Sequence, residues 1–275
     1  MTSPQTRVRA FHLPAASGQW FAVFHSASTA APRGAFVYVH PFAEEMNKTR
    51  RMAALQARAF AAAGYAVLQL DLHGCGDSSG EFDAASWDGW RQDVALAAEW
   101  LAREVDAPLH LWALRAGALL AIDAWCRDPS RFASALLWNP VVDGRTYLTQ
   151  FLRIAVARDA LNGTRATTST LRAQLERGEH VDVAGYALSG ALARGVEAQH
   201  LAQAVLPTKA RVHWIDVRSS PEPPQPVAAV LSQWRSADAN VEYSAVAGDA
   251  FWSTVEIVEV PALIEASTAI YARAD

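Results

Sequence analysis

Charged side chains and cysteines are both scarce in this chain, and each shortage excludes a class of protein. Only 19% of its 275 residues are charged and the formal net charge is −4, so no positive surplus exists to neutralise a nucleic-acid backbone. The two cysteines, Cys75 and Cys126, are too few for a disulfide framework or a zinc site. We therefore expect no nucleic-acid partner and no bound metal.

Long apolar runs are missing as well. No run reaches the roughly 18 residues that a membrane span needs, and residues 1–13 lack the apolar core of a secretory signal peptide. These absences predict a cytoplasmic protein without a membrane span. Hydrophobic residues still make up 51% of the chain, which is enough for a large buried core.

The first half of the chain alternates apolar runs with helical patterns. Residues 18–25 alternate apolar and polar side chains, which predicts a half-exposed strand. Continuous apolar runs predict buried strands at 35–40, 65–71, 108–113 and 133–138. Helical patterns separate them at 48–63, 87–104 and 116–126. This order is typical of right-handed βαβ units in a parallel sheet.

The alternation stops after residue 144. Residues 145–205 show helical patterns with polar interruptions and no clear strand. Strand patterns then return at 211–217 and 241–246, with helical patterns at 226–236 and near 254–272. We therefore predict an α/β core made of residues 1–144 and 206–275, with residues 145–205 inserted as a helical cap.

The turn between the strand at 108–113 and the following helix is the most informative segment. Small residues, Ala113 and Gly117, flank Arg115 there. A strand–turn–helix unit with this spacing of small residues is where an α/β-hydrolase carries its nucleophile, in the pattern Gly-x-Ser-x-Gly. The small side chains let the strand and helix backbones approach closely.

Three segments, in this order, resemble the α/β-hydrolase superfamily, in particular its serine aminopeptidase and lipase-like branch. His40–Phe42 is similar to the oxyanion loop, Asp71–Ser78 to the Gly-rich segment after the next strand, and Ala113–Gly117 to the nucleophile elbow. The resemblance covers nearly the whole chain. It implies the α/β-hydrolase fold, with a mostly parallel central sheet and helices on both faces.

A finer resemblance rests on the segment Pro41–Lys48 together with arginine at position 115. This combination resembles the family called exosortase A system-associated hydrolase 2. That family is associated with bacterial exopolysaccharide and sorting-signal gene sets, so the resemblance implies a bacterial hydrolase.

Two members of the Ser-His-Asp triad are absent. Arg115 cannot attack a carbonyl, because a guanidinium stays protonated and offers no usable lone pair. The base is expected on the turn at 247–252, which contains no histidine, and no histidine follows His213. Glu222 lies where the acid is expected, but it would have no base to orient. The sequence therefore predicts a degenerate triad.

The oxyanion hole can survive this loss, because its donors are backbone N–H groups. The resemblance places them at Phe42 and Ala116. Ala116 also opens a helix, whose N-terminus favours anions. Arg115 beside these donors favours an anion-binding site over an acylation site.

Each remaining candidate residue has both a functional and a structural interpretation. We expect Arg115 to pair with a carboxylate, Glu44 first and Asp143 or Glu45 second, or to contact a ligand. The resemblance implies that His40 orients its loop. Trp252 occupies the expected histidine loop and is a candidate pocket residue.

Two other side chains are weak substitutes for the nucleophile. Cys75 lies on the wrong loop and lacks a base, and Ser78 is better placed to cap the following segment. The glycines between His73 and Gly80 superficially suggest a dinucleotide fingerprint, but their spacing is wrong. We expect no cofactor.

Two functional hypotheses follow. The first is a non-hydrolytic member of the fold that binds a small anionic or acyl ligand, or a protein partner, under its cap. The second is an ester or thioester hydrolase with a non-standard catalytic constellation. A purely structural interaction module is a third interpretation, which a pocket filled by its own side chains would favour.

Overall fold

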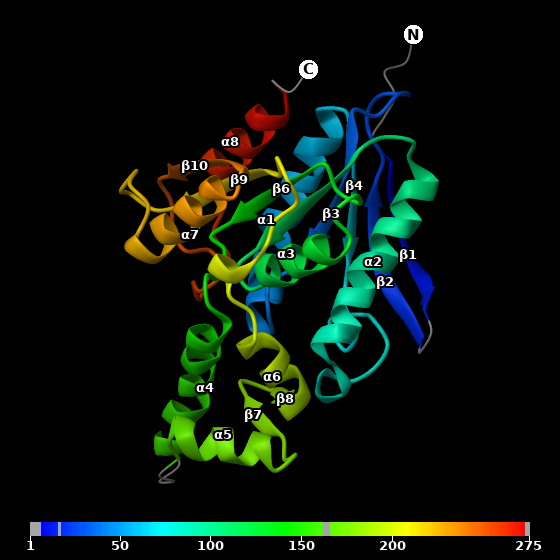
Figure 1. The fold of residues 1–275 in the computed structure, drawn as a ribbon. Coiled ribbons are helices and arrows are strands. Elements are labelled where there is room, and N and C mark those ends of the chain that lie inside the picture. The colour runs from blue at the N-terminus through cyan, green and yellow to red at the C-terminus, as the bar shows by residue number, and fades with distance from the viewer. Residues whose placement is uncertain (1–6, 16–17, 162–165, 273–275) are drawn as a thin grey trace.

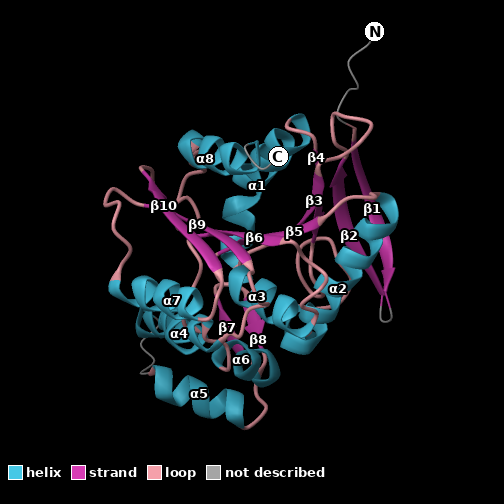
Figure 2. Ribbon diagram, turned by 45° about the horizontal axis from the view of Figure 1, so that its top comes forward, coloured by secondary structure: helices cyan, strands magenta, loops and turns pink. Residues whose placement is uncertain are grey.

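An eight-stranded sheet runs through the middle of the molecule (Figure 1 and Figure 2) in the order β1-β2-β4-β3-β5-β6-β9-β10. The computed structural model describes residues 7–15, 18–161 and 166–272, so part of the N-terminal segment 1–13 lies outside the described residues. The strands of the sheet are β1 (Val8–Ala15), β2 (Gly18–His25), β3 (Gly34–Val39), β4 (Tyr65–Leu70), β5 (Leu109–Leu114), β6 (Ser134–Trp138), β9 (Arg211–Val217) and β10 (Asn240–Val246).

Six of these strands, from β4 to β10 in the sheet order, are parallel, as the βαβ alternation predicts. The strand expected at 18–25 is β2, and it pairs antiparallel with both β1 and β4. Strand β1 was not predicted, because most of its side chains are exposed and its pattern is correspondingly weak. The predicted α/β-hydrolase architecture is confirmed.

Helices cover both faces of the sheet (Figure 2). Helix α1 (Glu44–Ala62) and α8 (Pro261–Ala272) lie on one face, and α2 (Trp87–Glu104), α3 (Gly117–Arg127) and α7 (Gln225–Ser236) on the other. Successive residues of a strand point to opposite faces, so Trp112 and Leu114 of β5 pack with α1 while Leu111 and Ala113 pack with α2 and α3. Each face buries its own hydrophobic core.

The segment between β6 and β9 lies at one end of the sheet (Figure 1). It contains α4 (Gly144–Leu161), α5 (Thr168–Glu176), β7 (Val181–Val183), β8 (Tyr186–Leu188), α6 (Gly190–Glu197) and the 3-10 turn η2 (Leu201–Gln203). The expectation of no strand in 145–205 was wrong, because β7 and β8 form a separate antiparallel hairpin. Its turn has positive φ at Ala184 and Gly185, as a two-residue type I′ hairpin requires.

The chain enters and leaves this segment at one place. Residues 142–144 and 199–201 run side by side, with an isolated bridge between Asp143 and His200. The Gly144 N–H donates to the Gln199 carbonyl at 2.9 Å, and the Leu201 N–H donates to the Val142 carbonyl at 2.9 Å. These backbone bonds tie the two crossings together.

The last helix is shorter than the 254–272 expected. Helix α8 begins at Pro261, and proline favours the first turn because its N–H is not needed there. The preceding residues form no helix, and Val255 and Ile257 are exposed. The apolar side chains of this loop were misread as part of the helical pattern.

Candidate functional site

The elbow keeps the backbone of a nucleophile turn. Arg115 lies between β5 and α3 with φ at 55°, a conformation that costs a residue other than glycine about 1–3 kcal/mol. Its N–H donates to the Trp138 carbonyl at 3.0 Å, and its carbonyl accepts from the Val141 N–H at 3.1 Å. A Cβ on Gly117 would lie 2.6 Å from the Val39 carbonyl oxygen, so only glycine fits there.

The Arg115 head group turns inward and is held by an ion pair. Its Nη2 and Nε lie 3.3 and 3.4 Å from Oε1 of Glu45, and Nη1 donates to the Asn139 carbonyl at 3.3 Å. The guanidinium carbon also lies 5.0 Å from the ring centre of Trp252, within the range of a cation–π contact. Only 21% of the Arg115 side chain is exposed.

The partner is therefore Glu45 and not Glu44, the first expectation. Glu44 faces Lys48, one turn further along α1, at 4.0 Å. Consecutive residues of a helix point about 100° apart, so only one of the two glutamates can face the elbow. The structure selects the one that is 15% exposed.

Glu45 is held in a largely dry environment. Burial raises the pKa of its carboxyl group, while the Arg115 charge and the nearby Tyr147 hydroxyl act in the opposite direction. Burial also raises the pKa of Tyr147, and the Glu45 charge adds to this shift. Tyr147 comes from α4, so the segment between β6 and β9 contributes a side chain to the site.

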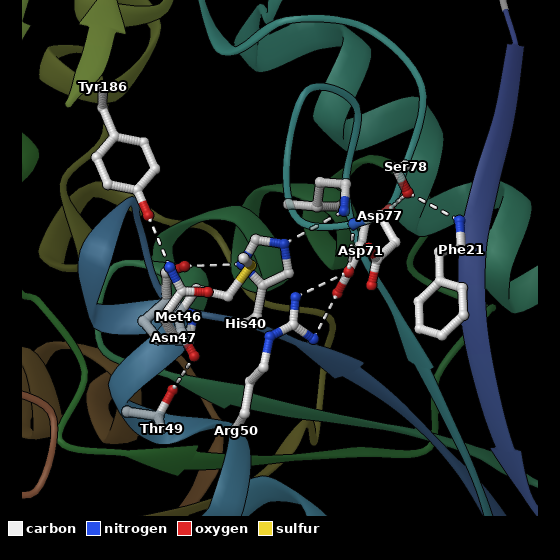
Figure 3. A network of polar contacts seen from close by, with 12 residues as sticks. Phe21, His40, Met46, Asn47, Thr49, Arg50, Asp71, Asp77, Ser78 and Tyr186 are labelled. Carbon is white, nitrogen blue, oxygen red and sulfur yellow. Dashed lines mark hydrogen bonds and ion pairs between the residues drawn. The ribbon is translucent and has the colours of Figure 1, made fainter. Parts of the chain in front are cut away.

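His40 holds the loop between β3 and α1. Its Nδ1 bonds the Pro41 carbonyl at 2.7 Å, and its Nε2 accepts from the Leu72 N–H at 3.2 Å (Figure 3). This pair of bonds requires the neutral Nδ1–H tautomer, and burial lowers the pKa of the ring. His40 therefore orients its loop, as the resemblance implied, and has no proton to exchange with a substrate at Arg115.

The two expected oxyanion donors remain free. Among the described residues, no hydrogen bond uses the backbone N–H of Phe42 or Ala116. Both residues are buried and line a common cavity of about 10 Å³, which is less than the space that one water molecule needs. Arg115 does not line this cavity.

Asp143, a candidate partner of Arg115, is engaged elsewhere. Its Oδ1 accepts from the Thr146 N–H at 2.6 Å at the start of α4, and its Oδ2 lies 3.8 Å from Nε2 of His200. His200 was not predicted to have any role in the site. The pair lies at the two crossings of the inserted segment.

Trp252 occupies the position where a catalytic histidine is expected. It is 8% exposed and packs against Phe251 and Arg115. Glu222, the expected acid, is exposed and bonds Ser220. Among the described residues, no histidine base and no acid that could orient such a base lies beside Arg115.

Sequence analysis missed three residues around the elbow: Tyr147, Asn139 and Asp216. Asp216 is buried and accepts from Trp214 Nε1 at 2.8 Å and from the Tyr243 hydroxyl at 3.1 Å. Burial raises the pKa of Asp216, and these donors oppose the shift. An acidic residue between the apolar Ile215 and Val217 was the available signal for Asp216. Asn139, with φ at 41°, was signalled by its place before Pro140 at the end of β6.

The substitute nucleophiles are both buried. Burial raises the pKa of the Cys75 thiol well above its usual range, and only a thiolate is a good nucleophile. The Ser78 hydroxyl donates to the Asp71 carbonyl at 2.5 Å and accepts from the Phe21 N–H at 2.8 Å (Figure 3). Ser78 thus fixes the Gly-rich loop to β2.

Neither a metal cluster nor a membrane helix is found in the part of the chain that the structure describes. No group of three or more histidine, cysteine, aspartate or glutamate side chains there is arranged to hold a metal ion. No helix among these residues is long and apolar enough to cross a bilayer.

Solved structures that are similar to this chain include two esterases and a lipase. Est1E from Butyrivibrio proteoclasticus, solved with ferulic acid bound, is 14% identical with a TM-score of 0.64, over 95% of this chain and 97% of that one. A carboxyl esterase from Bacillus coagulans, in complex with glycerol, is 14% identical with a TM-score of 0.68, over 96% and 97%. A soluble variant of monoglyceride lipase from Saccharomyces cerevisiae is 12% identical with a TM-score of 0.64, over 98% and 97%. At these identities the likeness shows the fold.

The family follows from the sequence match itself. A comparison with curated proteins gave no significant match. Residues 30–187, more than half of the chain, match the family model described as serine aminopeptidase, S33. This stretch includes the oxyanion loop, the Gly-rich segment, the elbow and all but the last residue of the β7–β8 hairpin. The chain therefore belongs to the serine aminopeptidase S33 family of α/β-hydrolases.

Proposed function

We propose that this chain is a non-hydrolytic member of its family that binds a small anionic or acyl ligand, or a protein partner, at the elbow. The ion pair between Arg115 and Glu45 carries the proposal. It fills the nucleophile position with a group that cannot attack a carbonyl. Trp252, packed on the same guanidinium, fills the position of the base.

The free donors favour an anion as the ligand. The N–H groups of Phe42 and Ala116 have no hydrogen-bond partner among the described residues, and bonds from such donors to a charged acceptor are strong. The small cavity at these residues cannot hold a ligand without rearrangement. An incoming carboxylate would therefore exchange with Glu45 as the partner of Arg115.

Hydrolysis assays test this proposal directly. With p-nitrophenyl butyrate and a short acyl thioester we expect no turnover near about 1 s⁻¹, the lower end of the ordinary enzyme range. Arg115→Ser should stay equally inactive, because the base is still missing. The double variant Arg115→Ser/Trp252→His supplies both the serine nucleophile and the histidine base, and it serves as the positive control. Turnover by the wild-type protein above about 1 s⁻¹ would overturn the proposal.

The alternative is an ester or thioester hydrolase with a non-standard constellation. It is favoured by the esterase and lipase folds that the chain resembles. If wild-type turnover is observed, Cys75→Ser and Ser78→Ala locate the nucleophile. Loss of activity in one of them would support the alternative.

We further propose the finer assignment to the exosortase A system-associated hydrolase 2 family, with a bacterial source and a cytoplasmic location. The supporting observation is that Glu45, in the segment Pro41–Lys48, pairs with Arg115. The segment Pro41–Lys48 and the arginine at position 115, on which the resemblance rests, are therefore joined by an ion pair. A related chain with serine at the elbow and glutamate unchanged at position 45 would count against this assignment.

We also propose residues 1–144 and 206–275 as the core domain and residues 145–205 as a cap. The backbone bonds between 142–144 and 199–201 support this division. Limited proteolysis tests it, with first cleavage expected inside 145–205 and the core fragments retained.

A further inference from the structure

A second cavity lies away from Arg115, between α1 and strands β2 and β4. Its volume is about 220 Å³. An engineered apolar cavity of about 150 Å³ in another protein holds benzene, so this space admits a single aromatic ring with one added group. It is smaller than the pockets of drug-sized ligands, which start at about 300 Å³.

About half of the side chains that line this cavity are apolar. Phe21 comes from β2, Leu70 from β4, and Met46 and Ala54 from α1. Figure 3 shows Phe21 on β2 and Met46 on α1, from two different sides of this region. The other lining side chains carry polar groups, among them Tyr38, Gln69 and Asp71.

One uncompensated positive charge remains at the cavity. Arg50 is bound by Asp71 through two hydrogen bonds of 3.2 and 2.9 Å (Figure 3), so these two charges cancel. Burial lowers the pKa of the two lining histidines, His25 and His40, which favours their neutral forms. Arg58 lines the cavity from an exposed position on α1 and forms no ion pair with any residue in the described ranges.

We propose that this cavity binds a small organic monocarboxylate, with its apolar body against Phe21 and Leu70 and its carboxylate at Arg58. A single negative charge matches Arg58, and the apolar half of the lining favours an organic body over a fully hydrated ion such as inorganic phosphate. The proposal does not depend on the function proposed for the elbow, because Arg115 is not part of this cavity.

Fluorine NMR with 4-fluorobenzoate as the probe tests the proposal. We expect a dissociation constant on the order of 1 mM or tighter for a ligand of this size. The neutral isostere 4-fluorobenzamide should bind at least about 5-fold more weakly, because it lacks the charge-assisted bond. Inorganic phosphate should not displace the probe.

Variants assign the probe to its site. Arg58→Gln should weaken binding of 4-fluorobenzoate by about 5-fold or more, and Ala54→Phe should abolish it by filling the cavity. Arg51→Gln is the matched control, since Arg51 lies on α1 but pairs with Glu259 outside the cavity. It should bind the probe like the wild type.

Several results would overturn the proposal: no binding at about 5 mM probe, equal binding of the amide, displacement by phosphate, or no effect of Arg58→Gln. Loss of binding in Arg115→Ala with Arg58→Gln unaffected would place the anion at the elbow. That outcome would refute this site and support the function proposed above, so the two proposals fail separately.

Discussion

Replacing Arg115 by methionine separates the charge of this residue from its backbone role. Methionine keeps an unbranched apolar stem beside Trp252 and the same left-handed backbone, so the strain at φ 55° is unchanged. The substitution removes the partner of Glu45, the hydrogen bond to the Asn139 carbonyl and the cation–π contact. We expect the folded protein to lose stability because a buried carboxylate is then left alone.

The size of the loss follows from the geometry. At 3.3 Å and an effective dielectric constant of about 20, two unit charges attract by about 5 kcal/mol. The measured contacts are longer than the roughly 2.8 Å of a strong charge-assisted bond, and the side chains are 21% and 15% exposed. Both facts lower the expected cost to about 2–3 kcal/mol, below the 3–5 typical of a fully buried pair.

The stability lost in Arg115→Met should depend on pH, and the titration of the Glu45 carboxyl group sets the direction of this dependence. Burial raises the pKa of Glu45, and without Arg115 its pKa rises further. Because the pKa of Glu45 is higher in the folded state, the contribution of this group to stability is fully present below its unfolded pKa of 4.5. This contribution is lost as the pH rises through the folded-state pKa. Urea unfolding followed by tryptophan fluorescence should therefore show a larger deficit at about pH 8 than at about pH 5.

Two controls make the result interpretable. Arg127→Met removes an exposed arginine whose ion pair with Asp123 is worth at most about 0.5 kcal/mol. Glu45→Gln/Arg115→Met removes both charges and should recover most of the loss at about pH 8. A coupling energy below about 0.5 kcal/mol, or a deficit that grows as pH falls, would refute the argument.

Three further predictions concern buried side chains beside the central sheet and the glycine at the elbow. Burial lowers the pKa of His110 to about 4, so stability should fall as pH drops from about 6.5 towards about 4; His110→Gln should flatten this slope in urea unfolding, and an unchanged slope would contradict it. Tyr271→Phe removes a hydroxyl that lies 2.9 Å from the Ser134 hydroxyl and should cost about 1–2 kcal/mol in the same assay; a variant as stable as wild type would show that this bond contributes nothing. Gly117→Ala places a Cβ 2.6 Å from a Val39 carbonyl and should cost more than about 3 kcal/mol by strain; a soluble variant with wild-type stability would exclude close packing at the elbow.

Much of the fold could be predicted because buried strands leave continuous apolar runs in the sequence. The parallel strands and the early antiparallel strand were predicted in this way. Strands β7 and β8 have three residues each, too few for a period of two to be recognised. Strand β1 lies at an edge with most side chains exposed, so its pattern carries little information.

The candidate site was predictable only in part. The backbone of the elbow follows from small residues at positions 113 and 117, and an inward Arg115 follows from its position. The choice of Glu45 over Glu44 depends on where α1 begins, since one residue rotates a helix by about 100°. Tyr147 comes from the inserted segment, and nothing local in the sequence shows which of its side chains meets the elbow.

The bonds between residues 142–144 and 199–201 have a consequence for how this protein can diversify. The ends of the inserted segment are joined to each other as well as to β6 and the chain leading to β9. An insertion whose ends meet can be lengthened, shortened or exchanged with little effect on the closure of the sheet, because the entropy of closing a loop grows slowly with its length. The surface above the elbow is thus free to change in evolution while the Arg115 backbone stays fixed by the sheet. Chains that share this core are expected to differ most between these two crossings, and an engineered segment from a relative can be grafted there.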